Sequence, residues 1–377
     1  MEKTGIYVHI PFCKSKCYYC DFTSFAGRDK LASKYIKSLK KEIIHRKNDN
    51  VEIDTIYFGG GTPSYINEKH IVEILNTIRE NYKVLDDAEI TIEANPGTIT
   101  EDKLKTYLKC GINRISIGLQ SSRNEVLKSI GRIHTFEQWG NAILMAKQVG
   151  FKNINTDIII GLPGQSIYDI EDAIDQIVDY GLQHVSVYSL IVEEGTPLEE
   201  MLKNGKLKAT DEELERYMYW FAKRKLEDNG YKHYEVSNFA KEGFESKHNL
   251  NCWNQHSYMG FGLAASSYEN KSRRTNISDL DFYIKNIEDD NFDSLYVIEE
   301  EQNNSEEMKE FMMLGLRKID GVNVGDFRMK FSKDVFIVFK KEIEKLLTED
   351  LIELNKSNIR LTKKGLDLAN LVWEEFV

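Results

Sequence analysis

Three cysteines stand close together near the start of the chain, in the segment Cys13-Lys-Ser-Lys-Cys17-Tyr-Tyr-Cys20. They directly follow an apolar, strand-like run, Gly5-Ile-Tyr-Val-His-Ile-Pro-Phe12, so one loop at the end of a strand carries all three thiols. Three thiolates suit a [4Fe–4S] cluster in which one iron has no protein ligand, because four would normally close the cluster. The spacing therefore favours a metal cluster with one open iron.

Two other interpretations of these thiols are a zinc site and reduced structural thiols. A structural zinc site usually takes four protein ligands, and no fourth ligand stands nearby, because Cys110 and Cys252 are isolated. We therefore favour the cluster, whose open iron can chelate an amine and a carboxylate together. The methionine end of S-adenosylmethionine (SAM) offers that pair. Cys110, in a helical pattern before Gly111, is expected to be a buried structural thiol.

The elements that must position these groups alternate along the chain. Short apolar runs alternate with helical patterns such as that of residues 30–46, which favours βα units and a parallel sheet. The predicted strands cover residues 5–10, 54–58, 89–93, 114–118, 153–160 and 185–190. Six repeats are fewer than the eight of a closed barrel, so we expect an open, partial (β/α)6 barrel.

A second candidate segment, Gly59-Gly-Gly-Thr-Pro63, follows the second predicted strand. Glycines there let the backbone approach a ligand without an intervening Cβ. The alternative is an ordinary tight βα turn. The position at the carboxyl end of a barrel strand, which is the functional side of such barrels, favours a binding segment.

Three polar residues lie at or near the ends of later strands: Glu93, Gln120 and Asp157. A carboxylate among β-branched residues is costly to bury unless a partner compensates for it. A ligand hydroxyl is one such partner, and a neighbouring lysine or backbone amide is another. For each residue taken alone, both interpretations stay open.

Taken together, these segments resemble a known family. The spacing C-x3-C-x-aromatic-C, with Tyr19 as the aromatic, is similar to the signature of radical SAM proteins. The strand before Cys13, the segment Gly59–Pro63 and the pair His248-Asn249 resemble the oxygen-independent coproporphyrinogen III oxidase/dehydrogenase family, and its haem chaperone subfamily matches best. The match runs from about Gly5 into the C-terminal module.

The resemblance implies a radical SAM partial TIM barrel that binds a [4Fe–4S] cluster and SAM. It assigns the cluster to Cys13, Cys17 and Cys20. It assigns the contacts with SAM to Tyr7, Tyr19, Gly60, Gly61, Thr62, Glu93, Gln120, Arg132 and Asp157. A guanidinium at Arg132 could pair with the SAM carboxylate through two hydrogen bonds, while Gln120 and Asp157 suit the ribose hydroxyls.

Two departures separate the chain from the dehydrogenase. Phe22 stands where the dehydrogenase carries a further cysteine, and Cys13 comes almost at once, without the dehydrogenase's long N-terminal extension. We therefore expect a haem chaperone that does not oxidise coproporphyrinogen III efficiently. The alternatives are that oxidase itself, and another radical SAM enzyme acting on a tetrapyrrole.

The segment His248-Asn-Leu-Asn-Cys-Trp253 carries the candidate haem residues. The chaperone subfamily shows H-N-x-x-Y-W there, and this chain has Cys252 in place of the tyrosine. Imidazole and thiolate are both haem iron ligands, and Trp253 could pack on a porphyrin face. The alternative is that these side chains form a satisfied network under the barrel. Arg273 and its neighbours could meet haem propionates, or form a solvated basic turn.

The predicted organisation has three parts: a barrel at residues 1–230, an extension rich in aromatics and glycine at 231–300, and a winged-helix-like α+β module at 301–377. The net charge of −11 disfavours nucleic acid as a partner. No apolar run is long enough to span a membrane, and no secretory signal is visible. Clustered thiols suit a reducing compartment, so we expect a cytoplasmic protein that passes haem to a recipient protein, such as a membrane-associated respiratory enzyme.

Overall fold

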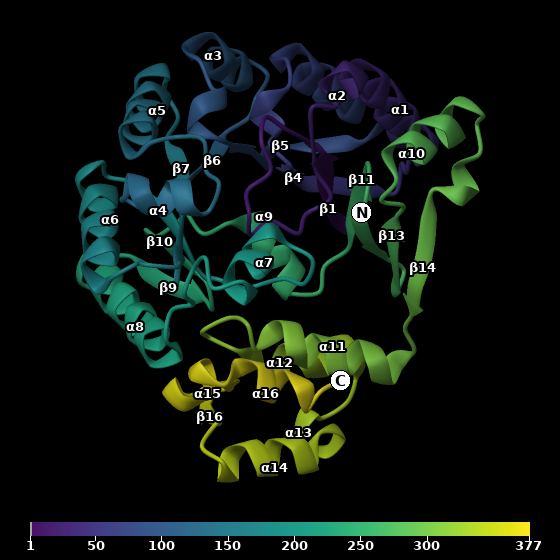
Figure 1. The fold of residues 1–377 in the computed structure, drawn as a ribbon. Coiled ribbons are helices and arrows are strands. Elements are labelled where there is room, and N and C mark those ends of the chain that lie inside the picture. The colour runs from purple at the N-terminus through teal and green to yellow at the C-terminus, as the bar shows by residue number, and fades with distance from the viewer. Residues whose placement is uncertain (1) are drawn as a thin grey trace.

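The computed structural model describes residues 2–377 and is built around one large, mostly parallel sheet. Across these residues the sheet has twelve strands, in the order β14-β13-β12-β11-β1-β4-β5-β6-β7-β8-β10-β9. All neighbouring pairs from β11 to β8 are parallel. In Figure 1 the helices α1 to α6 surround the strands, and the C-terminal module, in yellow, lies below them.

The six predicted strands are all present and lie next to one another in the sheet. They are β1 (Glu2–Ile10), β4 (Val51–Gly60), β5 (Lys83–Ala94), β6 (Arg114–Gln120), β7 (Asn153–Ile160) and β8 (His184–Ser189). The other strands are β2 (Phe12–Cys13), β3 (Phe25–Ala26), β9 (Lys232–Glu235), β10 (Asn238–Ala240), β11 (Tyr258–Phe261), β12 (Ser266–Glu269), β13 (Ser272–Asn276), β14 (Tyr296–Glu301), β15 (Val322–Asn323), β16 (Ile352–Asn355) and β17 (Asn358–Leu361).

The helices that follow the barrel strands are amphipathic and cover the outer face of the sheet. Up to residue 300 the helices of the chain, of which α9 lies below the interior of the barrel and not on this outer face, are α1 (Ala32–His45), α2 (Glu68–Asn81), α3 (Glu101–Lys109), α4 (Asn124–Ser129), α5 (Phe136–Val149), α6 (Ile167–Asp179), α7 (Pro197–Lys203), α8 (Glu212–Asp228), α9 (Lys247–Trp253) and α10 (Leu280–Glu288). Short 3-10 helices cover Asp29–Leu31, Pro63–Tyr65, Pro96–Thr98 and Phe292–Ser294.

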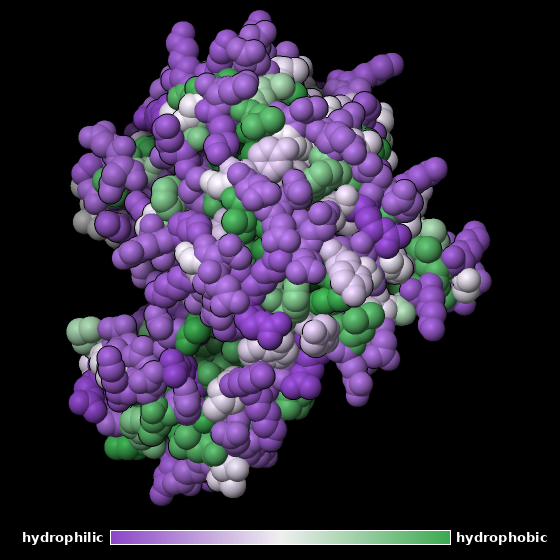
Figure 2. Space-filling model, turned by 90° about the vertical axis from the view of Figure 1, so that its left-hand side faces the viewer, coloured by the Kyte–Doolittle hydropathy of each residue, from purple (hydrophilic) through white to green (hydrophobic). Residues whose placement is uncertain are grey.

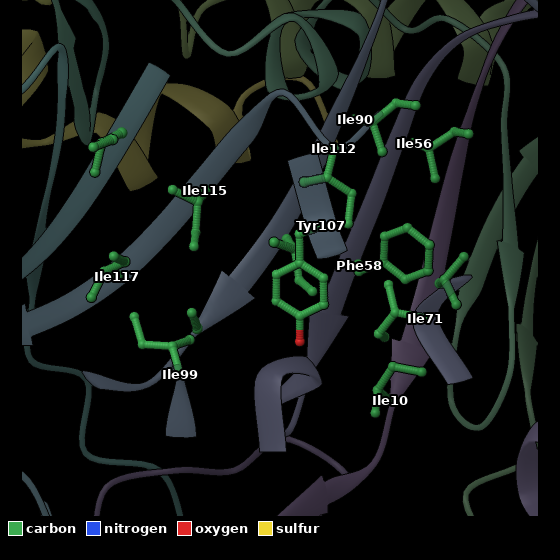
Figure 3. Close-up of a cluster of buried hydrophobic side chains, with 14 of the residues drawn as sticks. Ile10, Ile56, Phe58, Ile71, Ile90, Ile99, Tyr107, Ile112, Ile115 and Ile117 are labelled. Atoms are coloured by element: carbon green, nitrogen blue, oxygen red, sulfur yellow. The ribbon is translucent and has the colours of Figure 1, made fainter. Parts of the chain in front are cut away.

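Alternation along the strands separates an apolar outer face from a polar inner face. In β6, Ile115 and Ile117 are fully buried in the core, and the close-up shows them in one cluster with Ile90 of the neighbouring β5 and Tyr107 of α3 (Figure 3). The alternate residues Arg114 and Ser116 instead line the interior cavity. Since side chains alternate between the two faces of a strand, one strand can supply both the core and the functional interior.

Residues 231–300 add strands to both ends of the sheet. β10 pairs antiparallel with β8, whereas β11 pairs parallel with β1. A single hydrophobic core accordingly runs from Ile6 to Leu295 without a break at residue 230. The solvated basic turn considered for residues 271–274 is wrong in one respect, because Arg273 and Arg274 lie within strand β13 and pair with Glu310 and Glu269.

The C-terminal module has its own hydrophobic core, which begins at Met308 and ends at Phe376. Its helices are α11 (Asn304–Gly315), α12 (Val324–Phe331), α13 (Val335–Val338), α14 (Lys340–Thr348), α15 (Lys363–Asp367) and α16 (Ala369–Glu374). The predicted hairpin is β16–β17, and β15 joins it as a third strand. Figure 2 shows the module as a lower lobe, and the outer face above it is largely hydrophilic. Within residues 2–377, no helix is long and apolar enough to cross a membrane.

Candidate functional site

A cavity of about 480 Å³ opens inside the barrel at the carboxyl ends of the strands. Eleven of the residues predicted from the sequence line it: Cys13, Cys17, Tyr19, Cys20, Gly60, Gly61, Thr62, Glu93, Gln120, Arg132 and Asp157. The four predicted residues that do not line it are Tyr7, His248, Cys252 and Trp253. Segments far apart in sequence therefore converge on one interior space.

The cysteine loop is closed at its base by a small parallel pair of strands. β2 pairs with β3 through Phe12 with Phe25 and Cys13 with Ala26, so the loop leaves and returns at the same place. The next barrel strand is tied to this base as well, because the amides of Gly61 and Thr62 donate to the carbonyls of Ile10 and Phe12 at 2.9 Å each. The thiols are thus held beside the Gly60–Thr62 segment.

The three thiols are reduced and share one environment. Burial raises the pKa of Cys13 and of Cys20, and the nearby Cys17 thiolate raises both pKa values further. The Thr62 hydroxyl, which donates to Cys13 Sγ at 3.5 Å, lowers the pKa of Cys13 in part, and Arg132 Nη1 lies 3.6 Å from Cys17 Sγ. Among the described residues, no group of three or more His, Cys, Asp or Glu side chains is arranged around a single metal ion.

Glycine is required twice in the segment beside the thiols. Gly60 has a φ of +108°, and a Cβ there would lie 2.6 Å from the His9 ring. A Cβ on Gly61 would lie 3.0 Å from Cys13 Sγ. Both contacts are shorter than an ordinary van der Waals approach, so larger residues would push the segment away from the thiols.

His9 supports the cysteine loop from beneath, and the sequence analysis assigned it no role. Burial lowers the pKa of His9 to about 4, so its ring is neutral at physiological pH. One ring nitrogen bonds the Thr23 carbonyl at 2.8 Å, and the other bonds the Tyr7 hydroxyl at 3.1 Å. Tyr7 therefore lies one contact away from the cavity lining and acts on the loop through His9. The sequence contained a signal for this pairing, because Tyr7 and His9 are two residues apart on β1 and therefore lie on the same face of the strand.

Glu93 is an interior carboxylate with an unusual affinity for a proton. The Tyr57 hydroxyl donates to Glu93 Oε1 at 2.8 Å. Burial raises the pKa of Glu93 to about 7, and the nearby Asp157 carboxylate acts in the same direction. Glu93 therefore changes its protonation state near pH 7, and a cationic ligand beside it would favour the ionised carboxylate.

Gln120 and Arg132 carry buried polar atoms without partners. Gln120 adopts a left-handed backbone with φ of +65° at a bulge in the pairing of β6 with β7. Neither Gln120 Oε1 nor Arg132 Nε has a hydrogen-bond partner among residues 2–377. Backbone strain and orphaned polar atoms tend to occur where a ligand completes the site.

Asp157 is part of a polar network across the strands. Its carboxylate accepts from the Ser116 hydroxyl at 3.1 Å and from Asn155 Nδ2 at 2.8 Å. Asn155 in turn contacts His184 Nδ1 at 2.6 Å. The compensating partner of this carboxylate is therefore neither a lysine nor a backbone amide, because side-chain hydroxyl and amide groups hold it in place.

Helix α9, which carries the histidine motif, packs against the sheet below this cavity. The Glu89 carboxylate accepts from the backbone amides of Lys247 and His248 at the start of the helix. His248 Nδ1 bonds the Thr55 hydroxyl at 2.9 Å, and its ring stacks on Tyr57 with centroids 5.2 Å apart. These contacts belong to the satisfied network considered as the alternative for this segment.

Cys252 and Trp253 point away from the cavity. Burial raises the pKa of Cys252 to about 12. The Trp253 ring receives the Arg317 guanidinium at 4.4 Å, and the same guanidinium lies 4.5 Å from the ring of Trp373 in the C-terminal module. Trp253 thereby joins the barrel to that module. Cys110, predicted as a buried thiol, is half-buried at the end of α3 and contacts the Tyr107 carbonyl.

The site thus offers three soft sulfur ligands, a glycine-lined wall and a neighbouring set of polar groups with unused hydrogen-bonding capacity. Thiolates are the usual ligands of iron–sulfur clusters, and the orphaned atoms of Gln120 and Arg132 offer an acceptor and a donor to a polar ligand beside them. The residues present therefore fit a cluster together with a small zwitterionic molecule.

Comparison with known proteins agrees with this geometry. Residues 7–177 match the radical SAM superfamily, and residues 303–368 match the HemN C-terminal domain. The heme chaperone HemW of Bacillus subtilis (strain 168) is 35% identical, over 98% of this chain and 98% of the relative. That of Lactococcus lactis subsp. lactis (strain IL1403) is 36% identical over 100% of this chain and 98% of the relative.

The chain belongs to the HemW family of radical SAM proteins.

Among solved structures, the coproporphyrinogen III oxidase HemN from Escherichia coli has the same fold, with a TM-score of 0.86 and 22% identity over 100% of this chain and 90% of that one. Membership of the HemW family agrees with the expected partial barrel and the C-terminal module. The mitochondrial radical S-adenosyl methionine domain-containing protein 1 of Danio rerio is 29% identical over 98% of this chain and 86% of the relative.

Proposed function

We propose that this protein binds a [4Fe–4S] cluster, SAM and haem, and delivers the haem to a recipient protein. The observation that carries the proposal is the full-length similarity to proteins named heme chaperone HemW. The convergence of the three thiols with Gly60, Gly61 and Thr62 on one cavity supports the cofactor part.

The cluster would be held by Cys13, Cys17 and Cys20, and SAM by the residues named above for it. A cluster with an open iron supplies a coordination position for the amine and the carboxylate of SAM. Around that position the chain itself provides the ionisable Glu93 carboxylate and the Arg132 guanidinium, which suit the two charged ends of a methionine moiety.

For haem, His248 is the favoured iron ligand and Cys252 is the alternative. Burial lowers the pKa of His248 to about 4, so its imidazole is neutral at physiological pH, which is the form that binds a metal. The raised pKa of Cys252 keeps that thiol protonated, and a thiol binds iron only as the thiolate. Protonation therefore favours the histidine.

The residue at position 22 favours the chaperone proposal over the proposal of a porphyrinogen oxidase. The Phe22 side chain lies at the cavity and is 61% exposed. The dehydrogenase that this chain resembles carries a cysteine there, so a sulfur close to its cluster is replaced by a hydrocarbon ring. We accordingly expect little or no conversion of coproporphyrinogen III.

The proposal is tested by anaerobic reconstitution followed by haem titration of wild type, His248→Ala and Cys252→Ser. We expect haem absorbance to saturate in wild type and Cys252→Ser, and the axial-ligand spectrum to change in His248→Ala. A Cys110→Ser variant serves as the matched control for loss of a thiol elsewhere. Circular dichroism of each variant separates a lost ligand from a lost fold.

Two results would overturn the chaperone proposal. One is haem binding by wild type no stronger than that of an unrelated acidic protein. The other is robust turnover of coproporphyrinogen III by the reconstituted protein with SAM and a reductant, which would favour the oxidase instead.

A further inference from the structure

Arg114 stands deep inside the barrel, in a position that neither the cluster nor the SAM residues explain. It is the first residue of β6, and its side chain is 2% exposed and lines the interior cavity. Gln120 ends the same strand at the cysteine-loop end of the cavity. Six residues of strand separate the two, or roughly 20 Å at about 3.3 Å per residue. The cavity therefore extends well below the loop that carries the thiols.

The Arg114 guanidinium lacks the partner that a buried charge needs. Its Nε has no hydrogen-bond partner, and no carboxylate in the described part of the chain lies within ion-pair distance of it. A buried cation is costly unless an anion and hydrogen bonds compensate for it. The interior thus contains a fixed positive charge whose counter-ion the chain itself does not supply at close range.

None of the interior carboxylates forms an ion pair with Arg114. Glu89, on the neighbouring strand β5, accepts instead from the backbone amides of Lys247 and His248. Asp157 is already held by Ser116 and Asn155, and the pKa of Glu93 is raised to about 7, so this carboxylate is only partly ionised near neutral pH. The neighbouring histidines His184 and His248 have lowered pKa values, first through burial and then through the charge of Arg114 itself. The tyrosines facing it, Tyr57 and Tyr234, keep their protons because burial raises their pKa values.

The remaining lining of this lower cavity can hydrogen-bond an oxyanion. Ser186, Asn238 and Asn249 line the same space. The Ser186 hydroxyl donates to Asn155 Oδ1 at 3.3 Å and Asn238 Nδ2 donates to Glu235, so Asn249 is the residue of the three whose side chain has no hydrogen bond to another described residue. A carboxylate accepts several such donors at once, and a guanidinium binds it through two parallel hydrogen bonds.

We propose that Arg114 anchors a carboxylate of a ligand that reaches into the barrel below the SAM residues. The carrier that we assign is a propionate side chain of haem, and this part rests on the proposed function. SAM also has a carboxylate, but Arg132 lies beside the thiols and is the nearer cation for it. Arg114 would thus select haem by its propionate, separately from the residue that ligates iron.

The test compares haem with haem dimethyl ester, in which both propionates are masked. Anaerobically reconstituted wild type, Arg114→Gln and Arg114→Lys are titrated with each, and SAM affinity is measured on the same preparations. Arg123→Gln is the control for loss of a guanidinium, because Arg123 precedes α4 shortly after β6 and pairs with Asp169 outside the cavity lining. The comparison of haem with its dimethyl ester on wild type tests the proposal even if the variants do not fold.

We expect wild type and Arg123→Gln to bind haem about tenfold or more tightly than the dimethyl ester, because a hydrogen bond to a charged group is worth about 1.5–3 kcal/mol. Arg114→Gln should remove that preference, Arg114→Lys should restore part of it, and SAM affinity should stay unchanged.

Three results would overturn the inference. Equal affinity of wild type for haem and its dimethyl ester would show that no propionate is anchored, although haem binding and the proposed function would stand. Weaker SAM binding in Arg114→Gln with unchanged haem binding would assign the carboxylate to SAM. Failure of wild type to bind either porphyrin would instead remove the proposed function, and the assigned carrier with it.

Discussion

The two sides of the barrel interior are built in opposite ways. Beside the cysteine loop, Gln120 has a strained backbone and an orphaned oxygen, and Arg132 has an orphaned nitrogen. Beneath the cavity, the start of α9 is bonded to the sheet: Glu89 accepts from the helix amides, and His248 bonds Thr55, although Trp253 Nε1 at the other end of the helix has no partner among residues 2–377. The residues Gln120 and Arg132 beside the cysteine loop have hydrogen-bonding atoms left for a ligand, whereas His248 of α9 uses Nδ1 to bond the sheet.

This difference bears on how each motif should be interpreted. A motif whose polar atoms lack partners needs a ligand to complete it, because buried polar groups in folded proteins are almost always bonded. Where every polar atom of a motif is bonded within the protein, a role in stability is enough to explain the residues of the motif. The orphaned atoms of Gln120 and Arg132 therefore point to a polar ligand beside the cysteine loop, while the assignments of the cysteines to a cluster and of His248 to haem stay predictions that rest on the family.

The largest expected effect is loss of the cluster. In a Cys13→Ser, Cys17→Ser, Cys20→Ser variant, iron and sulfide should fall from about four each per chain to background after anaerobic reconstitution, because hydroxyls do not replace thiolates in such clusters. Metal analysis and absorbance spectra measure this. Cys110→Ser should keep full iron content, and an unchanged iron content in the triple variant would refute the cluster assignment.

The next effect concerns the glycine that lies between His9 and the loop. Gly60→Ala should destabilise the protein by about 2–4 kcal/mol, because it combines a positive φ with a clash against the His9 ring. Gly97→Ala is the matched control: it has no positive φ, its nearest contact would be 3.8 Å away, and it should cost under about 0.5 kcal/mol. Urea unfolding of both variants measures the difference, and equal costs would remove the steric argument.

Much of the fold could be predicted from the sequence. Strands of alternating or continuous apolar residues, such as 114–118, were found to within a few residues, because burial on the outer face forces isoleucine at every second position. The number of these apolar segments predicted the six parallel strands of the barrel. The flanking strands β9 to β14 were missed, since such short strands owe their structure to pairing with neighbours distant in sequence.

The predicted site was recovered unevenly, and the reason is physical. Cysteine spacing and strand-end position predicted groups that converge at one edge of a parallel sheet. Arg114 was missed because it starts its strand, where a sequence alone suggests a surface residue, and its place in the cavity lining follows only from the fold. His9 was quoted in a motif but given no function, since its partners Tyr7 and Thr23 are joined to it only in the folded chain.

A smaller effect concerns Glu93 and pH. Its pKa of about 7 in the folded protein lies above the ordinary value of 4.5, so folding favours the protonated form, and the contribution of this group to stability falls as pH rises from 4.5 through 7. Binding of a cationic group by the ionised form should show the opposite trend. We expect SAM affinity to rise about tenfold between pH 6 and pH 8 in wild type and to stay flat in Glu93→Gln. Isothermal titration at both values checks this, and a pH-independent wild type would exclude the ionised Glu93 as a contact of SAM.

The smallest effect tests the α9 side of the comparison. Asn251 Nδ2 donates to both carboxylate oxygens of Asp54, at 3.1 Å and 3.0 Å, and so joins α9 to β4. Because a hydrogen bond to a charged group contributes modestly when water can replace it, Asn251→Ala should cost about 1 kcal/mol. Asp54→Ala should cost a similar amount, and the double variant should cost less than the sum of the two, since the same contact is removed. Iron content and SAM affinity should stay at wild-type values in all three variants. If iron content fell with Asn251→Ala, the α9 contacts would be coupled to the cluster, and the division between a ligand side and a structural side would be wrong.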